Sequence, residues 1–368
     1  MRILVINVGG ASTKLAIYRD KRLLVEKTLN HPADEMSRYE TSALQVEYRA
    51  GIVNDYLREN GFSMDEIDAI GIRGPSIKQA AHGGTYLIDE EYRKFALAQY
   101  TPDKKPLHPS RIAIPIADKL VNGRSIPMFD TDPGAATEIP IVGRITGMKD
   151  VIRRPMGHVS NQKAVARREA ERLGKEYKDC RFIIAHLGSG ISVGAHADGG
   201  IIQMNNAGGG WGPFSPIRLG TVEANVLIDF CFQEGMTANR AKFIVRNETG
   251  MVSHLGTNDM REVERRIAEG DTYAELVFEA MAYQIGTEIC SRLADLRGLC
   301  DAIILTGAVA NSSNLVERIR KYVSWAAPFT VYPGEYENEA LAFGVYRVMS
   351  GEEKLQKLDE EIVDKSAD

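Results

Sequence analysis

The sequence predicts an α/β protein built from two similar halves, and three observations lead to this prediction. The chain has 368 residues, which suits about two domains of ordinary size. An apolar strand, a glycine turn and two further strands occupy residues 2–28, and residues 181–204 repeat that pattern half a chain later. Ile67–Gly74 and Cys300–Ala308 each follow a helical stretch and each end an apolar run in glycine. Duplication explains these matches, and chance similarity is the alternative because each match is short.

The first half reads as a meander, then a helix and a strand. Its expected elements are strands at Ile3–Ile6, Lys14–Tyr18 and Arg22–Thr28, a helix at Ala43–Asn60 and a strand from Ile67. Seven prolines before Pro155 break the region Thr101–Pro155 into short pieces. Within that region a strand is expected at Ile126–Phe129, ending in Asp130, and a helix follows at Asn161–Leu173 with Ser160 as its N-cap.

The second half repeats the order strand, strand, strand, helix, strand. The expected elements are strands at Phe182–Ala185 and Ile191–Ala195, a third strand after Gly200, a helix at Tyr273–Arg297, a strand at Cys300–Leu305 and a helix at Asn314–Tyr322. A last helix opens at Glu339, and the charged tail from Glu352 is expected to be helical or frayed.

Composition excludes several classes of protein. The 44% of apolar residues, the 26% of charged residues and the net charge of −5 are typical of a soluble globular protein. No long run of one charge sign suggests a nucleic-acid or membrane surface, and no apolar stretch approaches the ~20 residues of a membrane span. The four cysteines are scattered without a CxxC pair. We therefore expect a reduced, cytoplasmic protein without nucleic-acid or membrane partners.

Two glycine turns at matched positions suggest a phosphate site. Backbone N–H groups converge in such turns, and glycine lets a phosphate approach them closely. The alternative is that both glycine turns are ordinary β-hairpin turns without a ligand. Arg73 and Arg218 lie beside Gly/Pro loops, although most arginines are ordinary surface residues. Asp130 ends a strand, where a carboxylate can bind Mg²⁺ or merely cap a turn.

Further candidates come from loops and helix ends. His108 and His158 lie in Pro/Gly-rich loops, where a histidine is often incidental. The small residues of Thr306–Asn311 would let adenine or ribose lie against the backbone, or simply connect a strand to a helix. Glu339 would bind a ligand or only complement the dipole of its helix.

Together these residues resemble the acetate and butyrate kinase family, within the acetate kinase–sugar kinase–Hsp70–actin superfamily. Asn7, Gly9, Ser12 and Lys14 match the family pattern N-x-G-x-x-S-x-K. Longer stretches are most similar to the butyrate kinases, namely Asn161–Arg168, Ala185–His196, Gly212–Pro216 and Leu255–Asp259, supported by Gly83–Tyr86, Met281–Ile285 and Tyr332–Glu335. The resemblance spans nearly the whole chain.

The resemblance implies a fold, an activity and a set of cofactors. The fold would be a duplicated two-domain actin/hexokinase-like (ribonuclease H-like) α/β fold with the active site in an interdomain cleft. Residues 1–150 with a C-terminal helix at about 339–368 would form the carboxylate-side domain, and residues 151–338 the nucleotide-binding domain. The enzyme would use ATP and Mg²⁺ to convert a short-chain or branched carboxylate into an acyl phosphate and ADP. The family also implies a homodimer or larger homo-oligomer.

The resemblance also assigns roles to matching residues. Arg73 and Arg218 would hold the carboxylate and the transferring phosphoryl group, His158 would hydrogen-bond to the developing charge, and His108 matches a second active-site histidine less closely. Asp130, Glu339 and Asn7 would bind Mg²⁺. The residues assigned to ATP are Asn7, Gly9, Ser12 and Lys14 near the phosphates and the metal, His186, Gly188, Ser189 and Gly190 at the phosphates, and Gly307, Ala308, Ala310 and Asn311 at the adenosine.

Departures from the family pattern leave alternatives open. Gly157 stands where butyrate kinases have phenylalanine, and Gly208–Trp211 replaces a segment with an acidic residue. We hypothesise that Trp211 partly refills the volume left at Gly157; the alternative is that Trp211 packs at a subunit or domain surface. The alternatives are a kinase of acetate, propionate or another small acid, and a nucleotide-binding regulator of the same fold with reduced catalysis.

Overall fold

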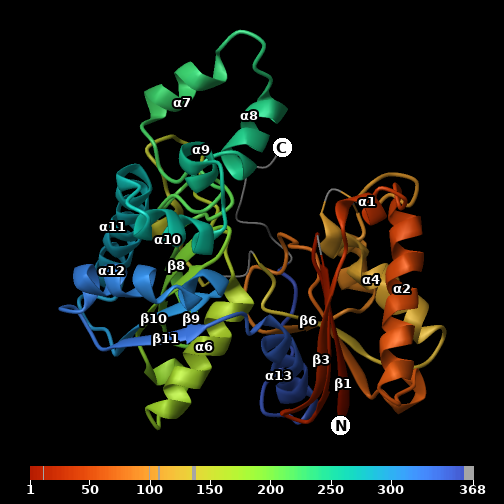
Figure 1. Cartoon of the computed structure of the whole chain (residues 1–368). Helices are drawn as coiled ribbons and strands as arrows, with labels where there is room; N and C mark the ends of the chain where they lie inside the picture. Colours follow the sequence, from red (N-terminus) through yellow and green to blue (C-terminus); the bar gives the residue numbers. More distant parts are fainter. Residues whose placement is uncertain (11, 99, 107, 135–137, 360–368) are drawn as a thin grey trace. The chain divides into compact units, whose positions relative to one another are not determined.

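The computed structural model describes residues 1–10, 12–98, 100–106, 108–134 and 138–359. Their contacts form two units (Figure 1). Among the described residues, the first unit comprises residues 1–134 and 336–359, and the second comprises residues 138–335. Each unit has a mixed β-sheet with helices on both of its faces.

The sheet of the first unit brings the ends of three parallel strands to one edge. Its strands are β1 (Arg2–Val8), β2 (Ser12–Arg19), β3 (Arg22–Asn30), β4 (Ala69–Ile72), β5 (Thr85–Leu87) and β6 (Met128–Thr131), in the order β3-β2-β1-β4-β6-β5. The central strands β1, β4 and β6 are parallel, whereas β2, β3 and β5 run antiparallel to their neighbours. The carboxyl ends of β1, β4 and β6 therefore lie side by side.

Alternation along β1 divides the core of the first unit into two layers. Leu4 and Ile6 pack with α2 and α4 on one face, and Ile3 and Val5 pack with α13 on the other. The helices are α1 (Ala33–Met36), α2 (Ser42–Glu59), α3 (Glu90–Ala96), α4 (Ala113–Val121) and α13 (Glu337–Met349), with short 3₁₀ segments η1 (Met64–Glu66) and η2 (Pro109–Ile112). Figure 1 shows α2 and α13 on opposite sides of this sheet.

The second unit repeats this plan. Its strands are β7 (Phe182–Leu187), β8 (Ile191–Ala197), β9 (Gly200–Met204), β10 (Ala302–Gly307) and β11 (Phe329–Pro333), in the order β11-β10-β7-β8-β9. Its helices are α5 (Ile141–Arg144), α6 (Val159–Arg172), α7 (Ala224–Cys231), α8 (Ala238–Asn247), α9 (Met251–Leu255), α10 (Met260–Ala268), α11 (Thr272–Asp295) and α12 (Ser313–Val323), with η3 (Tyr177–Asp179) and η4 (Ala308–Asn311). Ile183, Ala185 and Leu187 face α11 and α12, while α6 packs against β7 and β10.

The two sheets share one topology, which confirms the predicted duplication. The order β3-β2-β1-β4-β6 of the first unit corresponds to β9-β8-β7-β10-β11 of the second. In both sheets a three-stranded antiparallel meander is extended by two parallel strands. The strand β5 of the first unit has no counterpart in the sheet of the second unit.

Several element boundaries differ from the prediction. The helix α6 begins at Val159 with His158 as its N-cap residue, so Ser160 lies inside its first turn. Residues 352–359 form no helix; their backbone bonds to the first unit, for example from the Gln356 N–H to the Thr85 carbonyl at 2.9 Å. The rest of the tail, residues 360–368, lies outside the described residues. Residues 138–150 group with the second unit, where the Glu138 N–H donates to the Ile201 carbonyl at 3.0 Å.

Within the described ranges no helix is both long and apolar enough to cross a membrane.

Candidate functional site

In the first unit, the strand ends collect the polar residues that the sequence singled out. Ile6 pairs with Ile72 across β1 and β4, and Ile72 pairs with Asp130 across β4 and β6. Asn7 and Arg73 each follow directly, and the Arg73 N–H donates to the Ile6 carbonyl at 3.3 Å. Three chemically different side chains, an amide, a guanidinium and a carboxylate, therefore lie along one sheet edge.

A carboxylate that the sequence analysis did not select joins two of these residues. The Glu337 carboxylate accepts a hydrogen bond from Asn7 Nδ2 at 2.9 Å and lies 3.3 Å from Arg73 Nη1. Glu337 is 7% exposed and Asn7 is 2% exposed, so the amide is fixed in a solvent-poor setting. Glu339, which the sequence favoured, is half-buried in the same first turn of α13. The sequence spacing of Glu337 and Glu339 does not show which of the two carboxylates contacts Asn7 and Arg73.

Asp130 is the most perturbed acid of this edge. Its Oδ2 atom accepts a hydrogen bond from the Tyr92 hydroxyl at 2.6 Å, and both side chains are buried. Burial raises the pKa of the Asp130 carboxyl to about 7; hydrogen bonds from Tyr92 and Gly74 and the charge of Arg73 offset only part of this effect. A side chain at Gly74 would overlap Oδ2, so glycine is needed beside this carboxyl group.

The first glycine turn and His108 belong to the same unit. The Gly9 N–H donates to the Ser12 carbonyl at 2.8 Å, which closes the β1–β2 turn, and Lys14 stands opposite Asn7 in the pairing of the two strands. His108 caps η2 and bonds through Nδ1 to Ser110. Although its side chain keeps an exposed surface, partial desolvation and the nearby Arg73 and Arg111 charges lower its pKa.

In the second unit, two turns lie together at the ends of parallel strands. His186 pairs with Thr306 across β7 and β10, so Gly188–Gly190 and Gly307–Asn311 follow at the same edge. Gly307 has a φ of 92°, and a side chain there would overlap the Leu187 carbonyl. This close approach requires glycine and holds the two turns against each other.

Arg218 reaches this edge through its contact with the glycine turn. Its Nη1 atom donates to the Ala207 carbonyl at 2.9 Å, and a side chain at Gly190 would overlap the guanidinium. The Ser215 hydroxyl donates to the Ser189 carbonyl at 2.5 Å and accepts from the Arg218 N–H at 3.1 Å, which ties the arginine loop to the turn. Burial and the nearby Arg246 charge lower the pKa of Arg218, and its Nε atom is buried without a hydrogen-bond partner among the described residues.

The two histidines of the second unit stack on each other. The ring centroids of His158 and His186 are 3.7 Å apart and the rings are nearly parallel, at 10°. His158 is the N-cap residue of α6, and its Nδ1 lies 3.0 Å from the Ser192 hydroxyl. The stack brings His158 to the β7 end that carries the glycine turn.

The hypothesis that Trp211 refills the space at Gly157 is wrong for this structure. A side chain at Gly157 would meet Met204 Sδ at 2.6 Å and Ser192 Cβ at 2.8 Å, so those two residues already occupy that volume. The Trp211 ring lies instead beside two cations, 4.8 Å from Arg153 and 6.0 Å from Arg292.

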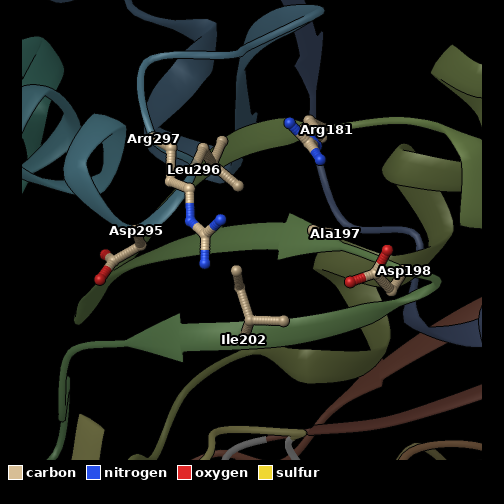
Figure 2. A pocket seen from close by; sticks show the side chains of 7 residues that line it. All are labelled: Arg181, Ala197, Asp198, Ile202, Asp295, Leu296 and Arg297. Carbon is tan, nitrogen blue, oxygen red and sulfur yellow. The ribbon is translucent and has the colours of Figure 1, made fainter.

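A pocket of about 270 Å³ in the second unit is separate from these turns (Figure 2). It is lined by Arg181, Ala197, Asp198, Ile202, Asp295, Leu296 and Arg297. Arg181 precedes β7, whereas Gly188 follows it, so the pocket lies at the opposite end of this strand from the glycine turn. Its two acids and two arginines balance in charge, and none of them is a predicted site residue.

The donor set of the first unit fits Mg²⁺. Over the described ranges, no group of three or more His, Cys, Asp or Glu side chains forms a metal cluster. Magnesium does not require one, since it commonly takes one or two carboxylates and keeps waters and phosphate oxygens as its other ligands. Asp130 and Asn7 at one edge, with Glu339 in the first turn of α13, supply hard oxygen donors.

The structure thus gathers the predicted residues into two clusters, one in each unit. The first contains Asn7, Gly9, Ser12, Lys14, Arg73 and Asp130, with His108 within electrostatic reach of Arg73. The second contains His158, His186, Gly188, Ser189, Gly190, Arg218, Gly307, Ala308, Ala310 and Asn311. Sequence reasoning missed Tyr92, Glu337, Ser192 and Gln162 as site residues, although Gln162 and Ser192 lie in the stretches Asn161–Arg168 and Ala185–His196 that it had marked. The interdomain cleft stays a prediction.

Comparisons with known proteins identify the family of this chain. The model of the Acetokinase family matches residues 2–326. A probable butyrate kinase of Clostridium botulinum (strain Alaska E43 / Type E3) is 38% identical over 353 residues, which cover 96% of this chain and 98% of the relative. Family membership supports carboxylate kinase activity in general.

Solved structures share the fold. The Porphyromonas gingivalis acetate kinase superposes with a TM-score of 0.75 at 20% identity, covering 94% of this chain and 98% of that one. A propionate kinase from Francisella tularensis subsp. tularensis SCHU S4 gives 0.74 at 19% identity, covering 93% and 98%. These likenesses confirm the predicted two-domain actin/hexokinase-like α/β fold. The family model and the 38% identical relative show that the chain belongs to the acetokinase family.

Proposed function

We propose that this protein transfers the γ-phosphoryl group of ATP to a short-chain or branched carboxylate, giving an acyl phosphate and ADP, with butyrate-like acids as preferred substrates. The observation that carries the proposal is the pair of clusters, an amide–guanidinium–carboxylate edge and a glycine-turn edge with Arg218 and two histidines. The butyrate preference rests on the name of the 38% identical relative.

The residue types suit this chemistry. A carboxylate is already ionised at neutral pH, so its oxygen can attack the γ-phosphorus without a general base, and the bond to the ADP oxygen breaks as the new P–O bond forms. The obstacle is repulsion between an anion and a polyanion, which positioning and cationic groups overcome. No proton has to be transferred to complete the step.

Two arginines, one partly exposed and one mostly buried, can offset the repulsion between the carboxylate and ATP. Arginine presents a planar fork of donors to carboxylate or phosphoryl oxygens. Arg73 is 42% exposed and is directed by the buried Glu337, so it keeps donors for a substrate carboxylate. Arg218 is held between the Ala207 carbonyl and Gly190, beside the turn proposed to bind phosphates.

The remaining roles follow the clusters. We assign the turns Gly188–Gly190 and Gly307–Asn311 to the phosphates and the adenosine of ATP, and His158 to a hydrogen bond with the charge that develops on the phosphoryl oxygens. When bound, Mg²⁺ would be held by Asn7, Asp130 and Glu339 and would neutralise charge on the ATP phosphates. Cytoplasmic location and a homo-oligomeric state remain part of the proposal.

One assay tests the proposal. The purified protein is incubated with Mg-ATP and straight and branched acids of two to six carbons, and hydroxylamine traps acyl phosphate as the hydroxamate. We expect product with four-carbon acids above that with acetate. Product with acetate or propionate alone would reassign the substrate. Absence of product with every acid, despite ATP binding, would reject the kinase.

Matched arginine variants test the mechanism. Arg73→Gln and Arg218→Gln should each lower kcat ~10²-fold or more, because a cationic group acting on the transition state is worth about 3 kcal/mol. Arg58→Gln and Arg240→Gln are the controls, since both arginines are exposed and form surface ion pairs. Equal turnover in all four variants would remove Arg73 and Arg218 from the mechanism.

A further inference from the structure

A chain of hydrogen bonds runs through the second unit and ends at His158. It links His158 Nδ1 to Ser192 Oγ at 3.0 Å, Ser192 Oγ to Gln162 Nε2 at 2.8 Å and Gln162 Oε1 to His196 Nε2 at 3.0 Å. His196 Nδ1 continues it to the Tyr177 hydroxyl at 2.7 Å. Ser192, Gln162 and His196 have no exposed surface, so water cannot replace these contacts.

The helical spacing in α6 and the alternation of side chains along β8 bring the residues of this hydrogen-bond chain together. Gln162 comes four residues after His158 at the start of α6, so both lie on the same side of the helix. Ser192, Gly194 and His196 alternate along β8 and share the face turned to α6. A side chain at Gly194 would overlap Gln162 Oε1, so this glycine leaves the space that the amide fills.

The direction of every hydrogen bond follows from one carbonyl group. Gln162 Nε2 lies 3.2 Å from the Ser192 carbonyl, which can only accept, so the amide nitrogen must point toward Ser192. Gln162 Oε1 then accepts from His196 Nε2–H. His196 Nδ1, the other ring nitrogen, lies 2.7 Å from the Tyr177 hydroxyl.

The same logic fixes the hydrogen of Ser192. Its Oγ atom accepts from Gln162 Nε2 at 2.8 Å and from the His158 backbone N–H at 3.3 Å. These two donors fill both lone pairs, so the single hydroxyl hydrogen must donate to His158 Nδ1. Protonation of His158 at Nδ1 would direct a third donor at an oxygen that has no lone pair left.

We infer that Ser192 and Gln162 are positioning residues that hold His158 as a neutral imidazole with its hydrogen on Nε2. The inference deepens the proposed function and rests on it for its catalytic meaning. An Nε2–H group donates to a developing negative charge, whereas a lone pair at Nε2 would repel it. The hydrogen-bonded residues therefore fix which nitrogen of the His158 ring carries the hydrogen that faces the phosphoryl group.

The first experiment reads the tautomer directly. Two-dimensional ¹H–¹⁵N spectra of the histidine side chains distinguish protonated from unprotonated ring nitrogens, and His158→Gln assigns the His158 signals among the seven histidines. In the unliganded wild-type protein at pH 8 we expect protonated Nε2 and unprotonated Nδ1. A protonated Nδ1 in the wild type would overturn the inference at once.

Variants then test the two positioning residues. Ser192→Ala removes the hydroxyl that donates to Nδ1, so the signal of an Nδ1–H ring should appear. Gln162→Glu replaces the amide donor by an isosteric carboxylate that draws the Ser192 hydrogen to itself, which should move the ring hydrogen to Nδ1. Ser42→Ala is the control, because Ser42 is a buried serine of the first unit whose hydroxyl donates to the Lys104 carbonyl at 2.8 Å.

Kinetics completes the test. Both variants should lower kcat by at least ~10-fold with KM for ATP changed less than ~3-fold, since a wrong histidine tautomer acts on the chemical step and can cost up to ~10⁴-fold. Unchanged tautomer and unchanged kcat in both variants would refute the positioning role. If the wild type shows the expected tautomer but forms no acyl hydroxamate with any acid, the proposed function fails while the hydrogen-bond assignment stands.

Discussion

Replacing Asp130 by asparagine should stabilise the metal-free protein at neutral and higher pH. The buried carboxyl has a pKa of about 7 in the folded protein, against its ordinary value of 3.8 in the unfolded chain. The folded state therefore binds this proton more tightly than the unfolded state does. Consequently the free energy of unfolding falls as the pH rises from 3.8 to 7, and the loss is complete above pH 7.

The two pKa values set the size of the effect. Linkage gives a loss of about 2 kcal/mol at pH 5 and about 4 kcal/mol at pH 8, relative to the protonated carboxyl. Asparagine has a similar shape and does not titrate. The stability difference between Asp130→Asn and the wild type should therefore grow by about 2–3 kcal/mol between pH 5 and pH 8.

The assay is urea-induced unfolding, followed by circular dichroism with a metal chelator present, at a series of pH values from 5 to 8. Tyr92→Phe serves as a companion variant, because loss of its hydroxyl donor should raise the Asp130 pKa further and destabilise by about 1.5–3 kcal/mol where the carboxylate is charged. Parallel stability curves for the wild type and Asp130→Asn would refute the reasoning. The same asparagine variant should lose activity if Asp130 holds Mg²⁺.

Three further variants and one control test contacts in the two units. Glu337→Gln removes the charge that directs Arg73, so kcat for acyl hydroxamate formation should fall ~10-fold while the far-ultraviolet spectrum stays unchanged. Gly190→Ala places a methyl group against the Arg218 guanidinium, and its effect on kcat should be larger than its effect on KM. The control is Gly51→Ala in α2, where a methyl group meets no other atom; this variant should raise the free energy of unfolding by about 0.5–1 kcal/mol. Trp211→Ala should keep the wild-type rank order of acids, because the ring lies beside arginines and not at Gly157; a changed order would contradict this.

The sequence by itself determined the elements and the duplication. Alternation and glycine turns act locally, so β1 and β7 were predicted within two residues of their observed ends. The N-cap of α6 was misplaced because Ser160 is a common capping residue, whereas packing of the His158 ring on His186 starts the helix earlier.

Only the tertiary structure decided which side chains meet. Glu337 and Glu339 look equivalent in the sequence, and the choice depends on where the first turn of α13 meets the end of β1. The Asp130 pKa is raised by burial and partly lowered by hydrogen bonds from Tyr92 and Gly74, and all of these effects come from segments distant in the sequence. The chain from His158 to Tyr177 joins a helix, a strand and a 3₁₀ turn. Such contacts depend on long-range packing and desolvation, for which local sequence patterns carry no signal.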